Sequence, residues 1–142
     1  MPEETYCIYD LLDEMRERPA MYTGQKSLIR LQAFISGYDY AMENRGIKDN
    51  CSPAFFRSIM FHDWVAERLG YTTSVPGWCN IILAETLSWS PEHHNWGKLT
   101  QAVQPADDAV ALDRFYELLD EYKANPPLPG PTLDERSWAE DE

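Results

Sequence analysis

The 142-residue sequence contains none of the short motifs that mark common catalytic or metal-binding sites. There is no Gly-x-Ser-x-Gly elbow, no His-Glu-x-x-His pair and no Cys-x-x-Cys pair. The 7 glycines are scattered singly and form no phosphate-binding loop. We therefore expect a protein that is not an enzyme, and we expect neither a cofactor nor a bound metal.

Long apolar runs are also missing. Runs such as Ile81–Ala84 are far shorter than the ~20 residues that span a bilayer. The N-terminal Met-Pro-Glu-Glu lacks the basic and apolar segments of a signal peptide, so we expect a cytoplasmic protein. The three cysteines, Cys7, Cys51 and Cys79, have no motif spacing, and we expect them to be reduced residues in or near the core.

Basic residues are scarce. The sequence has 12 Lys and Arg against 24 Asp and Glu, which gives a formal net charge of -12. An excess of negative charge repels nucleic acids and membrane surfaces and steers a protein towards basic partners. We therefore expect a basic protein as the partner, and neither a nucleic acid nor a membrane.

The sequence does contain enough apolar residues for a core, since 44% are hydrophobic and 13% are aromatic. Five stretches have apolar residues at helical spacing, with capping residues or prolines near their ends. We predict a single compact all-α domain of four to five helices within residues 1–124. The predicted helices run from about Thr5, a possible N-cap, to Arg18, from Ser27 to Gly46, from Ser52 to Gly70, from Trp78 to about Leu87, and from Pro105 to Lys123. The fourth stretch has an alternative, because Ile81–Leu83 could also form a buried strand.

Two segments lack helical patterning. Residues 88–104 are predicted to form a long irregular connection before the last helix, with a helical turn near Leu99. Residues 125–142 are predicted to form a proline-rich acidic C-terminal tail. Its first part, up to Pro131, should be extended, because closely spaced prolines are incompatible with a helix interior.

Acidic residues gather at helical spacing on the last predicted helix. Like charges four residues apart destabilise a helix by about 0.2–0.5 kcal/mol per pair, so we interpret this face as a surface for a basic partner. The alternative is a solvated face that keeps the protein in solution. A similar set (Asp10, Asp13, Glu14, Glu17) lies on the first helix. The predicted partner-binding carboxylates are Asp113, Glu117, Asp120 and Glu121.

Two tryptophans in the irregular connection are further candidates for partner binding. Trp89 and Trp96 flank a polar segment and lie outside the strong helical patterns. Tryptophan is enriched among the residues that dominate binding energy at protein interfaces. The alternative is that this loop packs onto the helices.

The three histidines give little support for a metal site. His93 and His94 are adjacent, so they would point in different directions in a regular element, and no zinc-type spacing surrounds His62. An enzymatic alternative would need a pocket among Tyr22, Tyr38, His62 and His94.

One string, in residues 18–24, reads Arg-Pro-Ala-Met-Tyr-Thr-Gly and is followed by an apolar helix that contains a Gly-Tyr pair. With pieces further along the chain, it resembles a group of small bacterial proteins. The residues that carry the resemblance are Arg18, Pro19, Met21, Tyr22, Gly24, Ser27, Leu28, Leu31, Phe34, Ile35, Gly37, Tyr38, Phe61, Trp64, Val65, Phe115, Leu118, Leu119 and Asp120.

The resemblance covers roughly residues 10–122, and the proline-rich tail lies outside it. Some members of the group resemble immunity proteins of bacterial toxin systems, which are cytoplasmic inhibitors that bind and block a cognate toxin. It implies no catalytic residues. Physically, the string predicts a helix–helix connector in which Pro19 ends the first helix, Met21 and Tyr22 fill the gap between helices, and Gly24 permits a tight turn.

Charge and resemblance together predict an acidic binding protein, an immunity-type inhibitor that binds and blocks a basic bacterial toxin. Two alternatives stay open at this point. One is the small enzyme with a pocket near Tyr22, His62 and His94, and the other is an adaptor that uses its proline-rich tail for recognition.

Overall fold

The computed structural model describes residues 7–48, 60–92, 95–128 and 130–140, and within these ranges it contains helices and no strand. The all-α prediction is confirmed. The elements are α1 (Ile8–Glu17), α2 (Pro19–Thr23), α3 (Leu28–Asn44), α4 (Met60–Arg68), α5 (Trp78–Thr86), the 3₁₀ turn η1 (Trp96–Lys98), α6 (Leu99–Ala102), α7 (Pro105–Ala124) and α8 (Leu133–Glu140).

The described part has eight α-helices, which exceeds the predicted four to five. Two of the additional helices, α2 and α6, have only five and four residues. Pro19 is predicted only to end the first helix, yet proline is also favoured in the first turn of a new helix, and here it is the first residue of α2. The predicted N-cap of the first helix, Thr5, and the predicted start of the third helix, at Ser52 and Pro53, lie outside the described residues.

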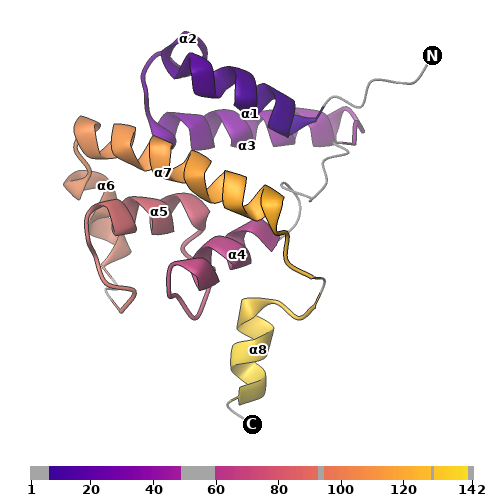
Figure 1. The fold of residues 1–142 in the computed structure, drawn as a ribbon, viewed down its shortest axis with the longest axis vertical. Helices are drawn as coiled ribbons and strands as arrows, with labels where there is room; N and C mark the ends of the chain where they lie inside the picture. The colour runs from indigo at the N-terminus through magenta and orange to yellow at the C-terminus, as the bar shows by residue number, and fades with distance from the viewer. Residues whose placement is uncertain (1–6, 49–59, 93–94, 129, 141–142) are drawn as a thin grey trace.

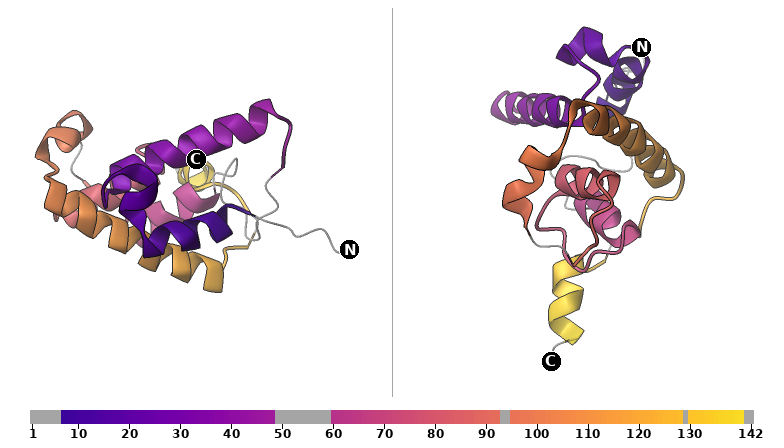
Figure 2. Two further views of the ribbon diagram at one scale, coloured as in Figure 1. Left: turned by 90° about the horizontal axis from the view of Figure 1, so that it is seen from above. Right: turned by 90° about the vertical axis from the view of Figure 1, so that its left-hand side faces the viewer.

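Helix α7 crosses the middle of the molecule (Figure 1). The views in Figure 1 and Figure 2 agree that α1 and α3 lie on one side of α7, and that α4 and α5 lie on the other. The buried residues of α7 face both groups of helices, so this helix forms the centre of the core. They are Ala111, Leu112, Phe115, Tyr116, Leu118, Leu119 and Tyr122.

Aromatic side chains join α4, α5 and α7. The ring of Phe61 on α4 lies 5.1 Å from that of Tyr122, 5.7 Å from that of Trp78 and 6.1 Å from that of Phe115, measured between centroids. All three pairs have edge-to-face geometry, which stabilises a pair by about 0.5–1.5 kcal/mol beyond the area buried. Phe61 is thus a central residue of this half of the core.

The C-terminal segment is not entirely extended. Residues 125–128 and 130–132 are non-helical, but α8 follows them. It begins with a capping box, because the Thr132 hydroxyl accepts from the Glu135 N–H at 3.2 Å and the Glu135 carboxylate accepts from the Thr132 N–H at 3.0 Å. This Thr-x-x-Glu signal is visible in the sequence and marks a helix that was not predicted within the tail.

Helix α8 is attached to α4 at its first turn and points away from the other helices (Figure 1). Leu133 is buried, and its N–H donates to the Asp63 carboxylate at 2.8 Å. Arg136 forms an ion pair with Glu67 at 3.0 Å. The division into a domain of residues 1–124 and a tail of residues 125–142 stays a prediction.

The cysteines differ from one another. Cys7, at the N-cap of α1, is disulfide-bonded, so the expectation of a reduced thiol is wrong for this residue. Cys79 on α5 is a half-buried free thiol. Among the described residues, no helix is long and apolar enough to cross a membrane.

Candidate functional site

The four predicted partner-binding carboxylates of α7 all form ion pairs within the protein. Their basic partners come from four different places: α1, the loop before α3, α4 and α7 itself. The pairs are Asp113–Lys26 at 2.8 Å, Glu117–Arg114 at 3.1 Å, Asp120–Arg16 at 2.9 Å and Glu121–Arg68 at 3.1 Å.

These ion pairs make the outer face of α7 a surface of mixed charge. The four carboxylate side chains are 46–64% exposed, and exposed pairs contribute only about 0–1 kcal/mol each to stability. Each carboxylate can therefore exchange its Lys or Arg for another cation at a small cost in free energy. The four carboxylates do not form an acidic patch without compensating charge. Their predicted role in partner binding stays a prediction.

The first helix presents a different acidic face. Asp13, Glu14 and Glu17 of α1 are exposed and make no ion pair or hydrogen bond to any described residue. Asp10 is excluded from this set because its carboxylate accepts from the Cys7 N–H at 2.9 Å and caps the helix. Asp13, Glu14 and Glu17, hereafter the α1 acidic face, carry uncompensated negative charge.

The two candidate tryptophans pack against the core. Trp89 and Trp96 are both half-buried, and the Trp96 ring lies 6.1 Å from that of Tyr71. Each keeps only part of its surface for a partner. Their role in binding also stays a prediction.

Met21 does not fill the gap between the helices, so the prediction is wrong for this residue, whereas for the partly covered Tyr22 it stays a prediction. No residue of α2 is buried, and Met21 is 72% exposed and Tyr22 37%. The reason is that Pro19 starts a separate five-residue helix, on which the Met21 side chain faces solvent. The exposed pair is a surface feature that the sequence analysis missed.

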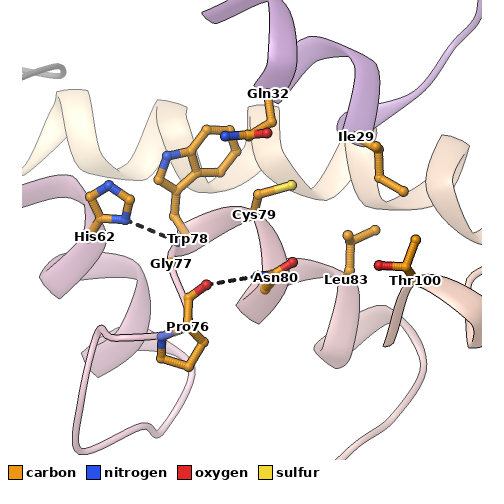
Figure 3. A pocket seen from close by; sticks show the side chains of 10 residues that line it. All are labelled: Ile29, Gln32, His62, Pro76, Gly77, Trp78, Cys79, Asn80, Leu83 and Thr100. Atoms are coloured by element: carbon orange, nitrogen blue, oxygen red, sulfur yellow. Dashed lines mark hydrogen bonds between the residues drawn. The ribbon is translucent and has the colours of Figure 1, made fainter. Parts of the chain in front are cut away.

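A pocket of about 190 Å³ lies beside the N-terminal end of α5 (Figure 3). His62 and Cys79 both line it, but Tyr22 does not, and His94 lies outside the described residues. The His62 Nδ1 atom accepts a hydrogen bond from the Trp78 N–H at 3.2 Å. Tyr38 does not line this pocket either, so the enzymatic alternative keeps only His62 of its four named residues there.

The titratable groups of this pocket are in their neutral forms at pH 7. Burial lowers the pKa of His62, partly opposed by the negative charge of Asp63. Burial and, less strongly, the charge of Asp108 raise the pKa of the Cys79 thiol to about 12. A thiol needs its thiolate form to act as a nucleophile or a metal ligand, and this one lacks it. No group of three or more metal-ligating side chains occurs among the described residues.

Comparisons with known proteins do not assign a family. No known protein family, no curated protein and no solved structure matches this chain. The likeness of residues 18–24 to small bacterial proteins therefore stays a prediction, and function must be inferred from the chain's own residues.

Proposed function

We propose that this protein is a non-enzymatic binding protein, and most specifically an immunity-type inhibitor that binds and blocks a basic bacterial toxin. The observation that carries the proposal is the α1 acidic face, three exposed carboxylates without an ion pair in the described part of a chain with a net charge of -12. Such a surface accelerates association with a basic protein and disfavours acidic ones.

The ion-paired face of α7 supports the same proposal in a second way. A basic side chain from a partner can replace Lys26 at Asp113 or Arg16 at Asp120, because both existing pairs are exposed. Each replacement exchanges one surface ion pair for another and frees a cation of the inhibitor. The α1 acidic face would attract the basic partner first, and the α7 carboxylates would then add ion pairs to the complex.

Two features of the pocket weigh against an enzyme. The Cys79 thiol is neutral at pH 7, and the Nδ1 atom of His62 is already used by the Trp78 N–H. The adaptor alternative also has less support, because the first turn of α8 is held on α4 by Asp63 and Glu67. We therefore carry neither alternative further.

We place the site of action in the cytoplasm, where immunity proteins of the group that residues 18–24 resemble meet their toxins. The disulfide of Cys7 counts against this location, because disulfides are rare in the reducing cytosol. Alkylation of the native thiols before and after reduction tests this location.

The experiment is capture from a lysate of the native source with the tagged protein, followed by washes at low and then moderate salt. A single stoichiometric basic protein is expected to remain, and its toxic activity should fall when this protein is added. No specific basic partner, or a partner whose activity is unchanged, would contradict the proposal.

A matched pair of variants tests the surface. Glu14→Gln with Glu17→Gln removes two charges from the α1 acidic face, whereas Glu43→Gln with Glu92→Gln removes two exposed charges elsewhere. We expect the first variant to bind the partner about fivefold more weakly at low salt, on the basis of about 0.5 kcal/mol per surface contact. The second should bind like the wild type.

A further inference from the structure

Helix α2 holds its exposed residues in a rigid turn. The Thr23 hydroxyl donates to the Pro19 carbonyl at 3.1 Å, and the Gly24 N–H donates to the Ala20 carbonyl at 2.9 Å. The Arg30 guanidinium from α3 donates to the Thr23 carbonyl at 2.9 Å. Main-chain groups of this short helix are therefore fixed from both ends.

Glycine is required where this turn ends. Gly24 has a φ of +84°, and a Cβ atom built there would lie 2.8 Å from Nη1 of Arg30. Only glycine adopts this conformation without strain and leaves room for the guanidinium. The backbone of the turn is held by the contacts of Thr23, Gly24 and Arg30, and not by the side chains of Met21 and Tyr22. The turn therefore holds these two residues in a fixed position whether or not a partner is bound.

Exposed methionine and tyrosine in a preorganised segment are suited to binding a protein. Both types are enriched at protein interfaces, and tyrosine is frequent among the residues that dominate binding energy. A rigid presenting segment reduces the entropy lost on association. Most of the Met21 side chain is exposed, and Tyr22 keeps about a third of its surface accessible to a partner.

The charges around this pair favour a basic partner. The α1 acidic face precedes α2 by only a few residues in the chain. Most nearby cations are already engaged, since Arg16 pairs with Asp120, Lys26 pairs with Asp113, and Arg30 binds the Thr23 carbonyl. Arg18 is the exception, because it is an exposed cation without an ion pair to any described residue. The three unpaired carboxylates of the α1 acidic face outnumber this single positive charge, so the local net charge is negative.

A groove next to α2 offers room for a basic side chain. This cavity of about 370 Å³ lies between α1–α2 and α7 and reaches Pro19, the first residue of α2. The carboxylates Glu17, Asp113 and Glu117 line it, together with the cations Arg16 and Lys26 and the ring of Tyr116. A Lys or Arg side chain that enters the groove would meet Glu17, which has no ion pair to a described residue, and would compete with Lys26 for Asp113 and with Arg114 for Glu117. An apolar neighbour of that side chain would contact Met21.

We propose that Met21 and Tyr22 are the apolar anchor of the partner-binding surface, with the α1 acidic face and the groove beside α2 as its charged surround. The occupant is a segment of a basic protein in which an apolar side chain is flanked by Lys or Arg. This inference rests on the proposed binding function and specifies its surface. Helices α2 and α8 lie at opposite ends of the molecule, so the surface does not involve the tail (Figure 2).

A library of random peptides displayed on phage provides a probe that does not depend on finding the toxin. Peptides selected on the wild-type protein should combine an apolar residue with Lys or Arg. They should bind the variant Met21→Gln with Tyr22→Gln about tenfold or more weakly, as expected when an interface anchor is removed. The control variant Tyr40→Gln with Val75→Gln removes exposed apolar surface elsewhere and should retain binding.

Both variants change exposed residues, so their circular dichroism spectra and melting temperatures should match those of the wild type, which separates lost binding from lost folding. Selection of no peptide, selection of peptides without basic residues, or equal binding to wild type and the Met21/Tyr22 variant would each overturn the inference. If lysate capture finds no toxin but the peptides behave as expected, the proposed inhibitor function fails while the surface stands.

Discussion

The imidazole of His62 on α4 accepts a hydrogen bond from the backbone N–H of Trp78, the first residue of α5, with an Nδ1···N distance of 3.2 Å. Gly77 occupies the N-cap position of α5 and has no side chain to accept from the free N–H groups of the first turn. His62 on α4 therefore supplies the hydrogen-bond acceptor that the N-cap residue of α5 lacks. Its Nδ1 atom can accept this hydrogen bond only while it is unprotonated.

This bond predicts a loss of stability in mild acid. Burial lowers the pKa of His62 from 6.5, so the unfolded chain binds a proton more readily than the folded one. The stabilisation is present above pH 6.5 and is lost as the pH falls below 6.5 towards the lowered pKa of the folded state. Urea unfolding at about pH 7.5 and about pH 5 should show this decrease.

The variant His62→Asn provides the control, because an amide oxygen can accept the same hydrogen bond but does not titrate. Its stability should change less between the two pH values than that of the wild type. His62→Ala should lose about 1 kcal/mol at neutral pH, the usual cost of removing a helix cap. Equal pH dependence in wild type and His62→Asn would contradict this role.

A second prediction concerns the contact between α3 and α7 at Ser27 and Asp108. The Ser27 hydroxyl accepts from the Arg30 N–H at 3.0 Å and donates to the Asp108 carboxylate, which also accepts from the Ile29 N–H at 3.0 Å. Ser27 is only 3% exposed. Ser27→Ala and Asp108→Ala should each cost about 1–2 kcal/mol.

Because the two residues share one network, the double variant should cost less than the sum of the single variants. Chemical denaturation of all four proteins would measure this coupling, and we expect about 0.5–1 kcal/mol. Strict additivity would mean that the two side chains act independently.

Thiol chemistry gives a third prediction. With its pKa raised to about 12, Cys79 should react slowly with iodoacetamide in the native protein at pH 7 and rapidly after denaturation. Cys7 should stay unmodified in both states until a reductant is added, because it is disulfide-bonded. Peptide mapping by mass spectrometry distinguishes the two sites. Alkylation of Cys7 in protein prepared from its native source without a reductant would argue for a reducing compartment.

The attachment of α8 to α4 gives a fourth prediction. Leu133→Asp should release α8, because burial of a leucine side chain contributes about 1.5–3 kcal/mol. Limited proteolysis between α7 and α8 should then be about tenfold faster. Leu128→Asp is a matched control, since Leu128 in the same connection is 90% exposed and its substitution should leave the cleavage rate unchanged. Equal rates for both variants would show that Leu133 does not hold α8.

Local signals predicted the helices where they were strong. Ser27 is the N-cap of α3, α5 begins at the predicted Trp78, and α7 begins at Pro105. Capping residues and prolines act through atoms a few positions away in the chain, so they can be recognised without knowledge of the fold. Two local signals of the same kind were overlooked: Pro19 as the start of α2, and the capping box of Thr132 and Glu135.

The sequence by itself determined the helical class, the starts of α3, α5 and α7, and the excess of negative charge, because these follow from composition and short-range spacing. Only the tertiary structure decided which carboxylates carry that charge outward. Asp113 and Asp120 meet Lys26 and Arg16 from segments 87 and 104 positions away, whereas Glu14 and its neighbours on α1 meet no cation among the described residues. Such pairings depend on how helices pack, and spacing along one helix contains no information about them.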